Sequence, residues 1–488
     1  MSLLRTDGYK FSMAEAGWPL RQETFYYAQR KGGAAILPFD VETELQKLMP
    51  MPTDDDYAYL AAHEYEMGAG FKAAVLFRNQ VVVRALPKGT WFLPREPVFS
   101  VTGPSALVSW LEPLALHLHY RIQLASLALT EPSALAAEVG TVTCEEQKDI
   151  VLSTLDSVGV RAPKVMVDSE AYFERVRATA ANLVRIVGDP ARIFEVGLRA
   201  ATCVKQHELA LQACKAAGIR RTSHVWAAAR LDMIPVGTMG HEHVQRFGSD
   251  EAAFRAMRDR RPGRSSYLLD TFDTIRSGIP AAFRLMGEEG YQRRGDSIRY
   301  DSGDKEMQYR YAAQEARKRG IRTVQILEDG FDAAQTEKFE VLRREVGWTP
   351  EEQFYGYGGY LIAKPSGTSL VRDRVAAVYK LSQTATSPTM KFGDDSGIGK
   401  ESIPGNPVVF RRRSGDGPRG VIGQAGEPPP QGYEQLTGGD VDPPRSIGAL
   451  DAPPSGRGAL DVALSDATQA LAAKLHVARK ALVAETSP

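Results

Sequence analysis

The stretch DSIRYDSGDKEMQYRYAAQEARKRGIRTVQILEDG, residues 296–330, decides the fold class. Its two ends, around SIRY and TVQIL, carry β-branched and aromatic residues and predict strands. The run KEMQYRYAAQEARKRG between them predicts a helix that ends at Gly320 as a C-cap. A strand, a helix and a strand in this order predict a parallel β-sheet.

The same alternation continues through the middle of the chain, from about residue 190 to 380. Helix-like runs such as KQHELALQACKAAG separate several short strand-like segments. These segments include IFEVGLR, RTSHVWAA, IPVGTMGH, SSYLLDTFD, FYGYGGYLI and AAVYKLS. About eight units of this kind predict an α/β fold with a closed, irregular parallel barrel.

The N-terminal region mixes strands and helices. Residues 24–31 (TFYYAQRK) predict a strand, and residues 40–49 and 54–66 predict helices with polar or acidic starts. Residues 105–129 form a long apolar run with helical periodicity. This run predicts a mostly buried helix with Pro113 near its start or at a kink.

The composition changes toward the C-terminus. Residues 414–458 are rich in Gly and Pro, which predicts a loop or a flexible linker. Residues 459–484 predict a terminal amphipathic helix, which more often serves packing or oligomer contacts than a site.

The charge balance limits the class of partner. The 488 residues contain 60 Lys+Arg and 60 Asp+Glu, so the formal net charge is zero. This balance argues against a general nucleic-acid or membrane-surface protein, and any positive charge for an anionic substrate must be local. The three cysteines form no CxxC pair, and we find neither a signal-peptide pattern nor an apolar stretch of membrane-spanning length. We therefore expect a cytoplasmic protein.

A histidine pair follows one of the predicted strands, in PVGTMGHEHVQRF, residues 235–247. A neutral imidazole such as that of His241 can attack a phosphoryl group, and a carboxylate can orient the ring and stabilise its charged form. Glu242 could supply that carboxylate, and so could a residue distant in sequence. Either histidine, His241 or His243, could also be an ordinary polar loop residue.

Acidic residues follow two more predicted strands. In IRYDSGD, Arg299 and Asp301 point to one face of the strand, and Asp304 comes after the turn. Arginine suits a planar carboxylate, and paired aspartates suit ribose hydroxyls or a phosphate-bridged Mg²⁺. The alternative is a surface ion pair. In LLDTFDTIRSG, Asp270 and Asp273 are candidate Mg²⁺ or hydroxyl ligands, or else helix caps.

Glycines and basic residues provide further candidates for phosphate binding. FYGYGGYLI places Gly358 and Gly359 where backbone N–H groups could cradle a phosphate, although such a loop alone is weak evidence. Single basic residues are usually solvated surface groups, but a polyanion would need several of them. The basic candidates are Arg30, Lys31, Lys380, Lys391 and Lys400.

Taken in order, these motifs resemble the nicotinate phosphoribosyltransferase family. The resemblance extends over residues 3–410 and is carried by several motifs along that length. They are TDGYKFSM, ETFYYAQRKGG, KGTWFLPREPVFSVTGP, GLR, PVGTMGHEH, LLDTFDT, IRYDSGD, FYGYGG, VYKL and KESIPG. An ordered set of this length is far more specific than any single motif.

The resemblance implies an architecture. It is that of the type II phosphoribosyltransferases, with an irregular α/β barrel and a second α+β domain built from N-terminal and returning C-terminal segments. Residues 1–130 would form the N-terminal part, 131–380 the barrel, 381–445 the returning segment, and 446–488 a linker and terminal helix. The family also implies a homodimer whose active sites lie between subunits.

The resemblance further implies an activity, in which phosphoribosyl pyrophosphate and nicotinate give nicotinate mononucleotide and pyrophosphate, as in salvage synthesis of NAD. ATP and Mg²⁺ would take part, and His241 matches the histidine that ATP phosphorylates. Basic groups and Mg²⁺ stabilise departing pyrophosphate, and positioning of the base supplies much of the rate.

Other site residues also match the family by position. Asp7 and Tyr9 match residues near the pyridine ring, supplied by the partner subunit. Arg199 and Arg299 match arginines that contact the substrate carboxylate or phosphate. Asp301 matches an acidic residue near the ribose of the donor, and Arg30 matches an arginine at its pyrophosphate.

Two departures from the family leave alternatives open. Val196 stands where the family has a ring-stacking aromatic residue, and residues 130–190 resemble an insertion. The chain could therefore use nicotinamide on the same fold, or bind substrates without turnover. The pair His241 and His243 also fits a metal-dependent hydrolase, although the only histidine after His243 is His476.

Overall fold

A computed structural model describes residues 1–288, 296–392, 401–414, 416–438 and 461–486 of the chain. Its central element is a seven-stranded parallel sheet with the order β10-β9-β8-β14-β13-β12-β11. The strands, in chain order, are β8 (Ile193–Glu195), β9 (Arg221–Thr222), β10 (Ile234–Pro235), β11 (Ser266–Leu268), β12 (Ser297–Tyr300), β13 (Val324–Leu327) and β14 (Gln353–Tyr357). Helices follow the strands along the chain, as the sequence predicts.

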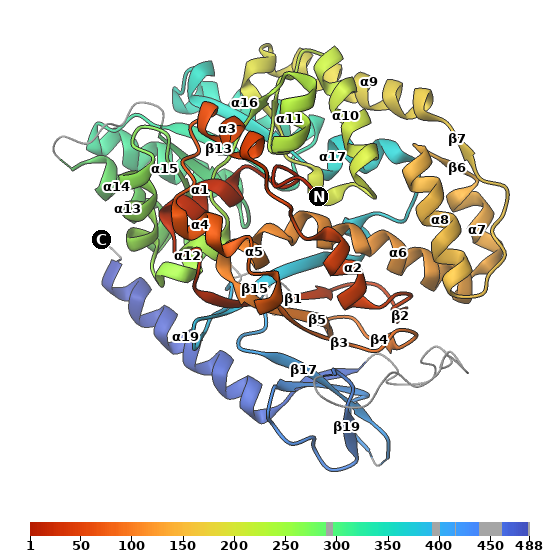
Figure 1. Cartoon of the computed structure of the whole chain (residues 1–488). Helices are drawn as coiled ribbons and strands as arrows, with labels where there is room; N and C mark the ends of the chain where they lie inside the picture. The colour runs from red at the N-terminus through yellow and green to blue at the C-terminus, as the bar shows by residue number, and fades with distance from the viewer. Residues whose placement is uncertain (289–295, 393–400, 415, 439–460, 487–488) are drawn as a thin grey trace.

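The helices around this sheet form the outer layer of the barrel (Figure 1). They are α9 (Ser169–Val187), α10 (Val204–Ala216), α11 (Val225–Leu231), α12 (His241–Phe247), α13 (Asp250–Arg260), α14 (Ile279–Met286), α15 (Lys305–Arg319), α16 (Ala333–Val346) and α17 (Gly359–Ile362). The predicted α/β fold with an irregular parallel barrel is confirmed. The expected closure by about eight units is wrong, because the segment AAVYKLS lies in a separate antiparallel sheet and, in the described part of the chain, the barrel has seven parallel strands and is open. It is irregular because β10 and β11 are the two edges of the sheet and do not pair with each other.

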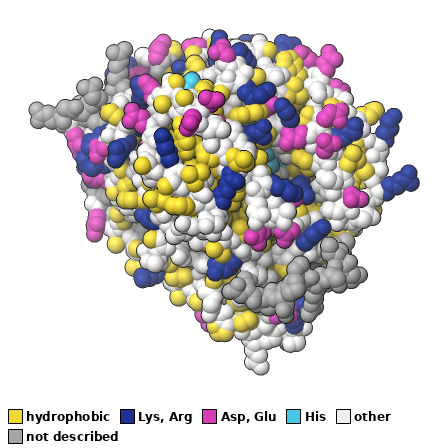
Figure 2. All heavy atoms as spheres, in the orientation of Figure 1, with side chains coloured by type: hydrophobic (Ala, Val, Ile, Leu, Met, Phe, Trp, Pro, Cys, Tyr) yellow, Lys and Arg dark blue, Asp and Glu magenta, His cyan; other side chains and the backbone are white. Residues whose placement is uncertain are grey.

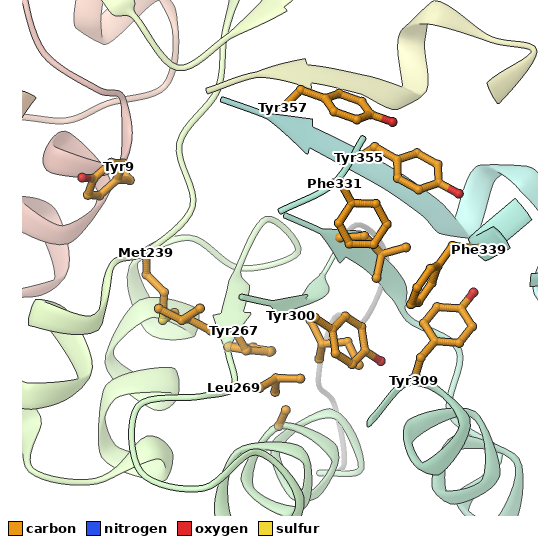
Figure 3. Packing of buried hydrophobic residues seen from close by; sticks show 14 of the residues in the cluster. Tyr9, Met239, Tyr267, Leu269, Tyr300, Tyr309, Phe331, Phe339, Tyr355 and Tyr357 are labelled. Carbon is orange, nitrogen blue, oxygen red and sulfur yellow. The ribbon is translucent and has the colours of Figure 1, made fainter. Parts of the chain in front are cut away.

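Aromatic rings fill the space between the sheet and its helices. Tyr300 of β12 and Tyr355 of β14 lie beside Tyr309 and Phe339 of the covering helices (Figure 3). Buried rings of this size dominate core stability, and edge-to-face contacts such as Tyr309–Phe339 add to it. This packed aromatic core holds the barrel strands, and with them the loops that follow the strands, in fixed positions.

The second domain is an antiparallel sheet with the order β16-β15-β1-β5-β3. Its strands are β1 (Gln22–Gln29), β3 (Val82–Ala85), β5 (Pro97–Pro104), β15 (Ala377–Thr384) and β16 (Ser387–Pro388). Because β1 pairs with β15, the chain returns to the N-terminal domain, as the resemblance implies. The boundary expected at residue 380 falls inside β15.

The helices predicted for the N-terminal region are present. Asp40 caps α2 (Val41–Leu48), and α3 (Asp54–Ala62) begins with a capping box. The apolar run forms α5 (Ser105–Trp110) and the buried α6 (Glu112–Thr130), and Pro113 lies in the first turn of α6. The shorter helix α4 (Ala69–Ala74) lies between α3 and β3 in the sequence.

The insertion-like stretch forms a small unit beside α6. It contains α7 (Pro132–Val139), β6 (Thr141–Val142), α8 (Glu145–Ser157) and β7 (Met166–Val167), and its apolar side chains form a core together with side chains of α6. It leads into α9 of the barrel.

The expectation of a linker over residues 414–458 is wrong for its first part. β18 (Gly420–Gln424) and β19 (Tyr433–Gln435) pair with β17 (Pro407–Arg412), and β20 (Val462–Leu464) joins this sheet. Pairing with β17 overrides the Gly-rich composition here. Residues 439–460 lie outside the described part of the chain. The terminal helix, α19, covers Asp466–Thr486.

Acidic and basic side chains alternate on the face of the molecule shown in Figure 2, without a broad field of one sign. This agrees with the zero net charge. Among the described residues, no helix is both long and apolar enough to cross a membrane.

Candidate active site

A cavity of about 360 Å³ lies where the barrel meets the N-terminal segment. Asp7 and Tyr9 line it from that segment, and Gly237 lines it from the loop after β10. The two loops touch, because a Cβ on Gly237 would lie 2.6 Å from the carbonyl carbon of Gly8. The backbone N–H of Gly8 donates to the Ser223 carbonyl at 2.7 Å. Asp7 and Tyr9 thus reach the cavity of their own chain, which corrects the expectation that a partner subunit supplies them.

Glu112, at the start of α6, organises the N-terminal side of the cavity. It accepts hydrogen bonds from the Tyr9 hydroxyl and the Lys10 ammonium, both at 2.6 Å. Arg199 lies 3.5 Å from Glu112 and 3.7 Å from the buried Asp7. Although burial raises the pKa of Glu112, Lys10 and Arg199 hold that pKa well below its usual range. The carboxylate therefore stays charged and fixes Tyr9 and Arg199 at the cavity wall.

Burial raises the pKa of Asp7 above its ordinary value, although Arg199 and a 2.6 Å hydrogen bond from the Ser223 hydroxyl oppose the shift. The Arg199 guanidinium lies 5.7 Å from the centre of the Tyr9 ring. The cavity thus has an aromatic face next to a cation.

Arg299 approaches the same cavity from β12. It donates to the Thr238 hydroxyl and lies 3.8 Å from Glu328. Its Nε and that of Arg199 are buried and have no hydrogen-bond partner among the described residues. A buried donor without a partner costs about 1–3 kcal/mol, more for a charged group, so both arginines favour an anionic ligand.

His241 begins α12, directly after Gly240, and is nine-tenths buried. Its Nε2 lies 2.9 Å from Asp270 and 3.8 Å from Asp301. Burial lowers the pKa of His241, although Asp270 opposes the shift, so the ring is neutral at pH 7. Because the Asp270 carboxylate accepts from Nε2–H, the lone pair resides on Nδ1. Such a ring can act as a nucleophile.

Lys391 completes the cluster from the returning segment. Its ammonium lies 3.1 Å from Asp270 and 3.9 Å from Asp301. Burial by itself raises the pKa of Asp270, but His241 and Lys391 hold it well below its usual range. The same two groups help to lower the pKa of Asp301, against burial and the Asp270 charge. Both carboxylates therefore remain ionised.

Three predicted site residues have other partners. Glu242 lines the cavity, but its carboxylate binds Lys10 at 3.1 Å, and Asp270 is the carboxylate that orients His241. Asp273 caps the turn Thr274–Gly278 through two backbone N–H groups, and it lines neither cavity. The exposed Asp304 caps α15 in the same way. Of the alternatives left open for Asp273, the cap is the one found, because Asp before a helix is a preferred N-cap.

The predicted glycine loop borders a second cavity of about 520 Å³. Gly358 and Gly359 line it together with Lys364 and Arg372. It shares Val196, Arg199, Asp301 and Glu328 with the first cavity. The two cavities therefore meet at the middle of the site.

Basic side chains gather where the returning strand passes the site. Lys380 of β15 pairs in register with Tyr26 of β1 and lines the first cavity. Burial, followed by the charge of Lys391, lowers the pKa of Lys380 to about 7. Arg30 adds to the same positive field, and its Nη2 is buried without a hydrogen-bond partner among the described residues. Lys400 lies outside the described residues.

Sequence reasoning missed Lys10, Glu112, Ser223 and Glu328, which line the site or bind residues that do. Lys10 stands inside the TDGYK motif, and Glu112 is an acidic residue within an apolar helix. Both residues could have been identified from the sequence, because a charged residue in a buried segment needs a partner of opposite charge. Val196 does line the cavity, and the aromatic rings there are those of Tyr9, Tyr65, Phe194 and Tyr379.

No protein-family model matches the chain. The nicotinate phosphoribosyltransferase of Bos taurus is 28% identical over 381 residues, a match that covers 73% of this chain and 65% of the relative. That of Homo sapiens is 27% identical with the same coverage. The chain thus spans just under two thirds of the length of these curated relatives.

The fold is also similar to that of solved structures. The nicotinate phosphoribosyltransferase from Porphyromonas gingivalis has a TM-score of 0.58 and 19% identity, covering 82% of this chain and 95% of that one. The one from Vibrio cholerae has a TM-score of 0.57 and 17% identity, covering 82% and 90%. Likeness at this identity supports the architecture described above.

Proposed function

We propose that the chain is a member of the nicotinate phosphoribosyltransferase family and that it transfers phosphoribosyl from phosphoribosyl pyrophosphate to nicotinate. The products are nicotinate mononucleotide and pyrophosphate, in salvage synthesis of NAD. The observation that carries the proposal is the cavity with two incompletely paired arginines, the buried Arg299 and the partly exposed Arg199, beside the neutral and oriented His241.

Nicotinate fits the first cavity by charge and shape. Its carboxylate would pair with the guanidinium groups of Arg199 and Arg299, which line the cavity, and its ring would lie against Tyr9. Nicotinamide is neutral and would make no charge-paired hydrogen bonds with the two guanidinium groups. A site built for a charged hydrogen-bonding group rejects an analogue that lacks it.

The donor fits the basic side of the site. Lys380, Arg30 and Lys391 would bind its pyrophosphate, and Asp301 would bind the ribose hydroxyls. As the bond to pyrophosphate breaks, positive charge develops on the ribose and negative charge on the leaving group. The ionised Asp301 stabilises the first charge, and the basic side chains stabilise the second.

His241 would couple turnover to ATP. Its Nδ1 attacks the γ-phosphorus, the bond to the β-phosphate oxygen breaks, and ADP leaves with that electron pair. The ring gains positive charge as the new bond forms, and Asp270 stabilises it through Nε2–H at 2.9 Å. Water later hydrolyses the phosphohistidine and restores the neutral ring.

Asp301 is a better candidate ligand for Mg²⁺ than the predicted pair of Asp270 and Asp273. Asp270 and Asp301 belong, with His241, to the one candidate cluster of metal ligands among the described residues. Both oxygens of Asp270 already bind protein groups, whereas Asp301 is about one-quarter exposed. Mg²⁺ prefers one or two carboxylates plus phosphate oxygens, so Asp301 would hold it. Bound there, the ion would neutralise phosphate charge.

The alternative of a metal-dependent hydrolase requires His243 to bind the metal together with His241, and the position of His243 argues against this. His243 is fully buried, and its Nε2 faces the Ala253 carbonyl at 3.0 Å, away from the His241 cluster. A cytoplasmic location remains part of the proposal and agrees with three free thiols. A homodimer also remains a proposal, based on the family resemblance, and sedimentation velocity would test it.

Calorimetric titration with each base tests the assignment of the first cavity. We expect wild-type protein to bind nicotinate at least tenfold more tightly than nicotinamide, and Arg299→Met to lose most of this preference. Asp304→Asn is the matched control, because it alters an exposed cap outside both cavities and should leave the preference unchanged. Equal affinity for both bases in the wild type would contradict the proposal.

A further inference from the structure

The last helix of the chain reaches the His241 cluster from outside the cavity. α19 runs from the C-terminal sheet to the barrel, where it packs against the turn Thr274–Gly278 after β11 (Figure 1). Val483 near its end is buried in the barrel core. Neither the resemblance nor the comparisons assign this helix a role. The residues that it contacts lie close in sequence to Asp270 and Lys391, which belong to the His241 cluster.

Arg479 of α19 touches both segments that supply those residues. Its Nε donates to the Phe272 carbonyl at 2.7 Å, and its guanidinium lies 5.3 Å from the centre of the Phe392 ring. Phe272 follows Asp270 by two residues, and Phe392 follows Lys391 directly. The two phenylalanine rings also pack on each other, with centroids 5.9 Å apart.

We propose that Arg479 is a positioning residue, which holds the Asp270 and Lys391 segments together so that both face His241. The proposal rests on the function proposed above. Asp270 and Lys391 are 121 residues apart in sequence. Their 3.1 Å contact therefore requires that the two segments that carry them are held at a fixed position relative to each other. Arg479 lines neither cavity, so it acts on the cluster and not on the substrates directly.

A second contact of the helix supports the same role. The ring of His476, one turn before Arg479, packs edge-on against Phe392 at 5.3 Å and pairs with Glu401 at 3.3 Å. Ser402, next to Glu401, accepts from the backbone N–H of Lys391 at 2.7 Å. Phe392, which follows Lys391, and Glu401, which precedes Ser402, thus both contact α19.

The test compares Arg479→Ala with Lys480→Ala, which removes a cation from the adjacent exposed position of the same helix. For Arg479→Ala we expect kcat to fall roughly 10- to 100-fold with KM within about twofold, as a small misplacement of a catalytic group does. Arg479→Lys keeps the cation over Phe392 and should recover part of kcat. Lys480→Ala should match the wild type.

A second readout does not require turnover. The ring resonances of His241, assigned by their loss in His241→Gln, should move in Arg479→Ala and stay in place in Lys480→Ala. If the wild type fails to convert nicotinate, the proposed function fails, while this signal still tests the positioning role. Unchanged His241 resonances in Arg479→Ala, or an equal kcat loss in Lys480→Ala, would overturn the inference. If Arg479→Ala does not fold, Arg479→Lys decides by the same two readouts.

Discussion

Replacing Asp270 by Asn removes the negative charge that faces His241 and keeps the size of the side chain. The affected Nε2–Oδ1 distance is 2.9 Å, in a site where Asp270 is 1% exposed. At an effective dielectric constant of about 20, a full charge pair at this distance is worth about 6 kcal/mol. If half or less of the positive charge has developed on the ring in the transition state, the loss is about 2–3 kcal/mol. This corresponds to a roughly 30- to 150-fold slower phosphorylation of His241.

The pH dependence separates this effect from a change in protonation. The Asp270 charge raises the pKa of His241, so its removal lowers that pKa further, and the ring stays neutral above the usual histidine pKa of about 6.5. The rate loss should therefore persist from pH 7 to 9. A rate that recovers at high pH would show that the charge acts through ring protonation.

The assay is single-turnover transfer of labelled γ-phosphate from ATP to the protein. Asp304→Asn is the matched control, since this exposed residue caps α15 outside both cavities and should change the rate by less than about twofold. Phosphorylation of Asp270→Asn within threefold of the wild-type rate would refute the reasoning.

Three further predictions concern the walls of the site. Lys380 has a pKa of about 7 and is charged below that pH, so kcat/KM for the phosphoribosyl donor should fall as pH rises through 7. Lys380→Met should abolish this fall in the pH profile. Gly237→Ala places a Cβ against Gly8 and should raise KM for nicotinate at least tenfold; unchanged kinetics would show that the N-terminal segment does not bind the base. Arg246→Ala removes the bidentate partner of the buried Glu23 at 2.9–3.0 Å, while Arg21 stays paired with it at 3.2 Å. The substitution should cost about 1.5–3 kcal/mol in urea unfolding, with a loss below about 0.5 kcal/mol as the contrary result.

Local patterns were enough to predict most of the fold. The βαβ stretch at residues 296–330 contains β12, α15 and β13, because its strand, helix and cap signals are all local. The strands β18 and β19 were missed, since their Gly-rich segments are stabilised by pairing with β17 and not by their own propensity.

The site was predictable only in part, for a related reason. His241, Asp301, Arg199 and Arg299 stand in motifs at strand ends, and the structure brings all four to one cavity. Asp304 and Asp273 carry the same local signal, because an aspartate at the end of a loop suits a helix cap as well as a ligand.

The partnership between Asp270 and Lys391 could not be read from the sequence. It joins two segments far apart in the chain, and only the packing of the returning segment against the barrel creates it.

The most direct test of the central claim is product formation from phosphoribosyl pyrophosphate with nicotinate or nicotinamide at equal concentration, each with and without Mg-ATP. The account predicts nicotinate mononucleotide, formed faster with Mg-ATP, and loss of that stimulation in His241→Ala with nicotinate binding largely intact. Turnover of nicotinamide in preference to nicotinate, or ATP hydrolysis that persists unchanged in His241→Ala, would contradict it.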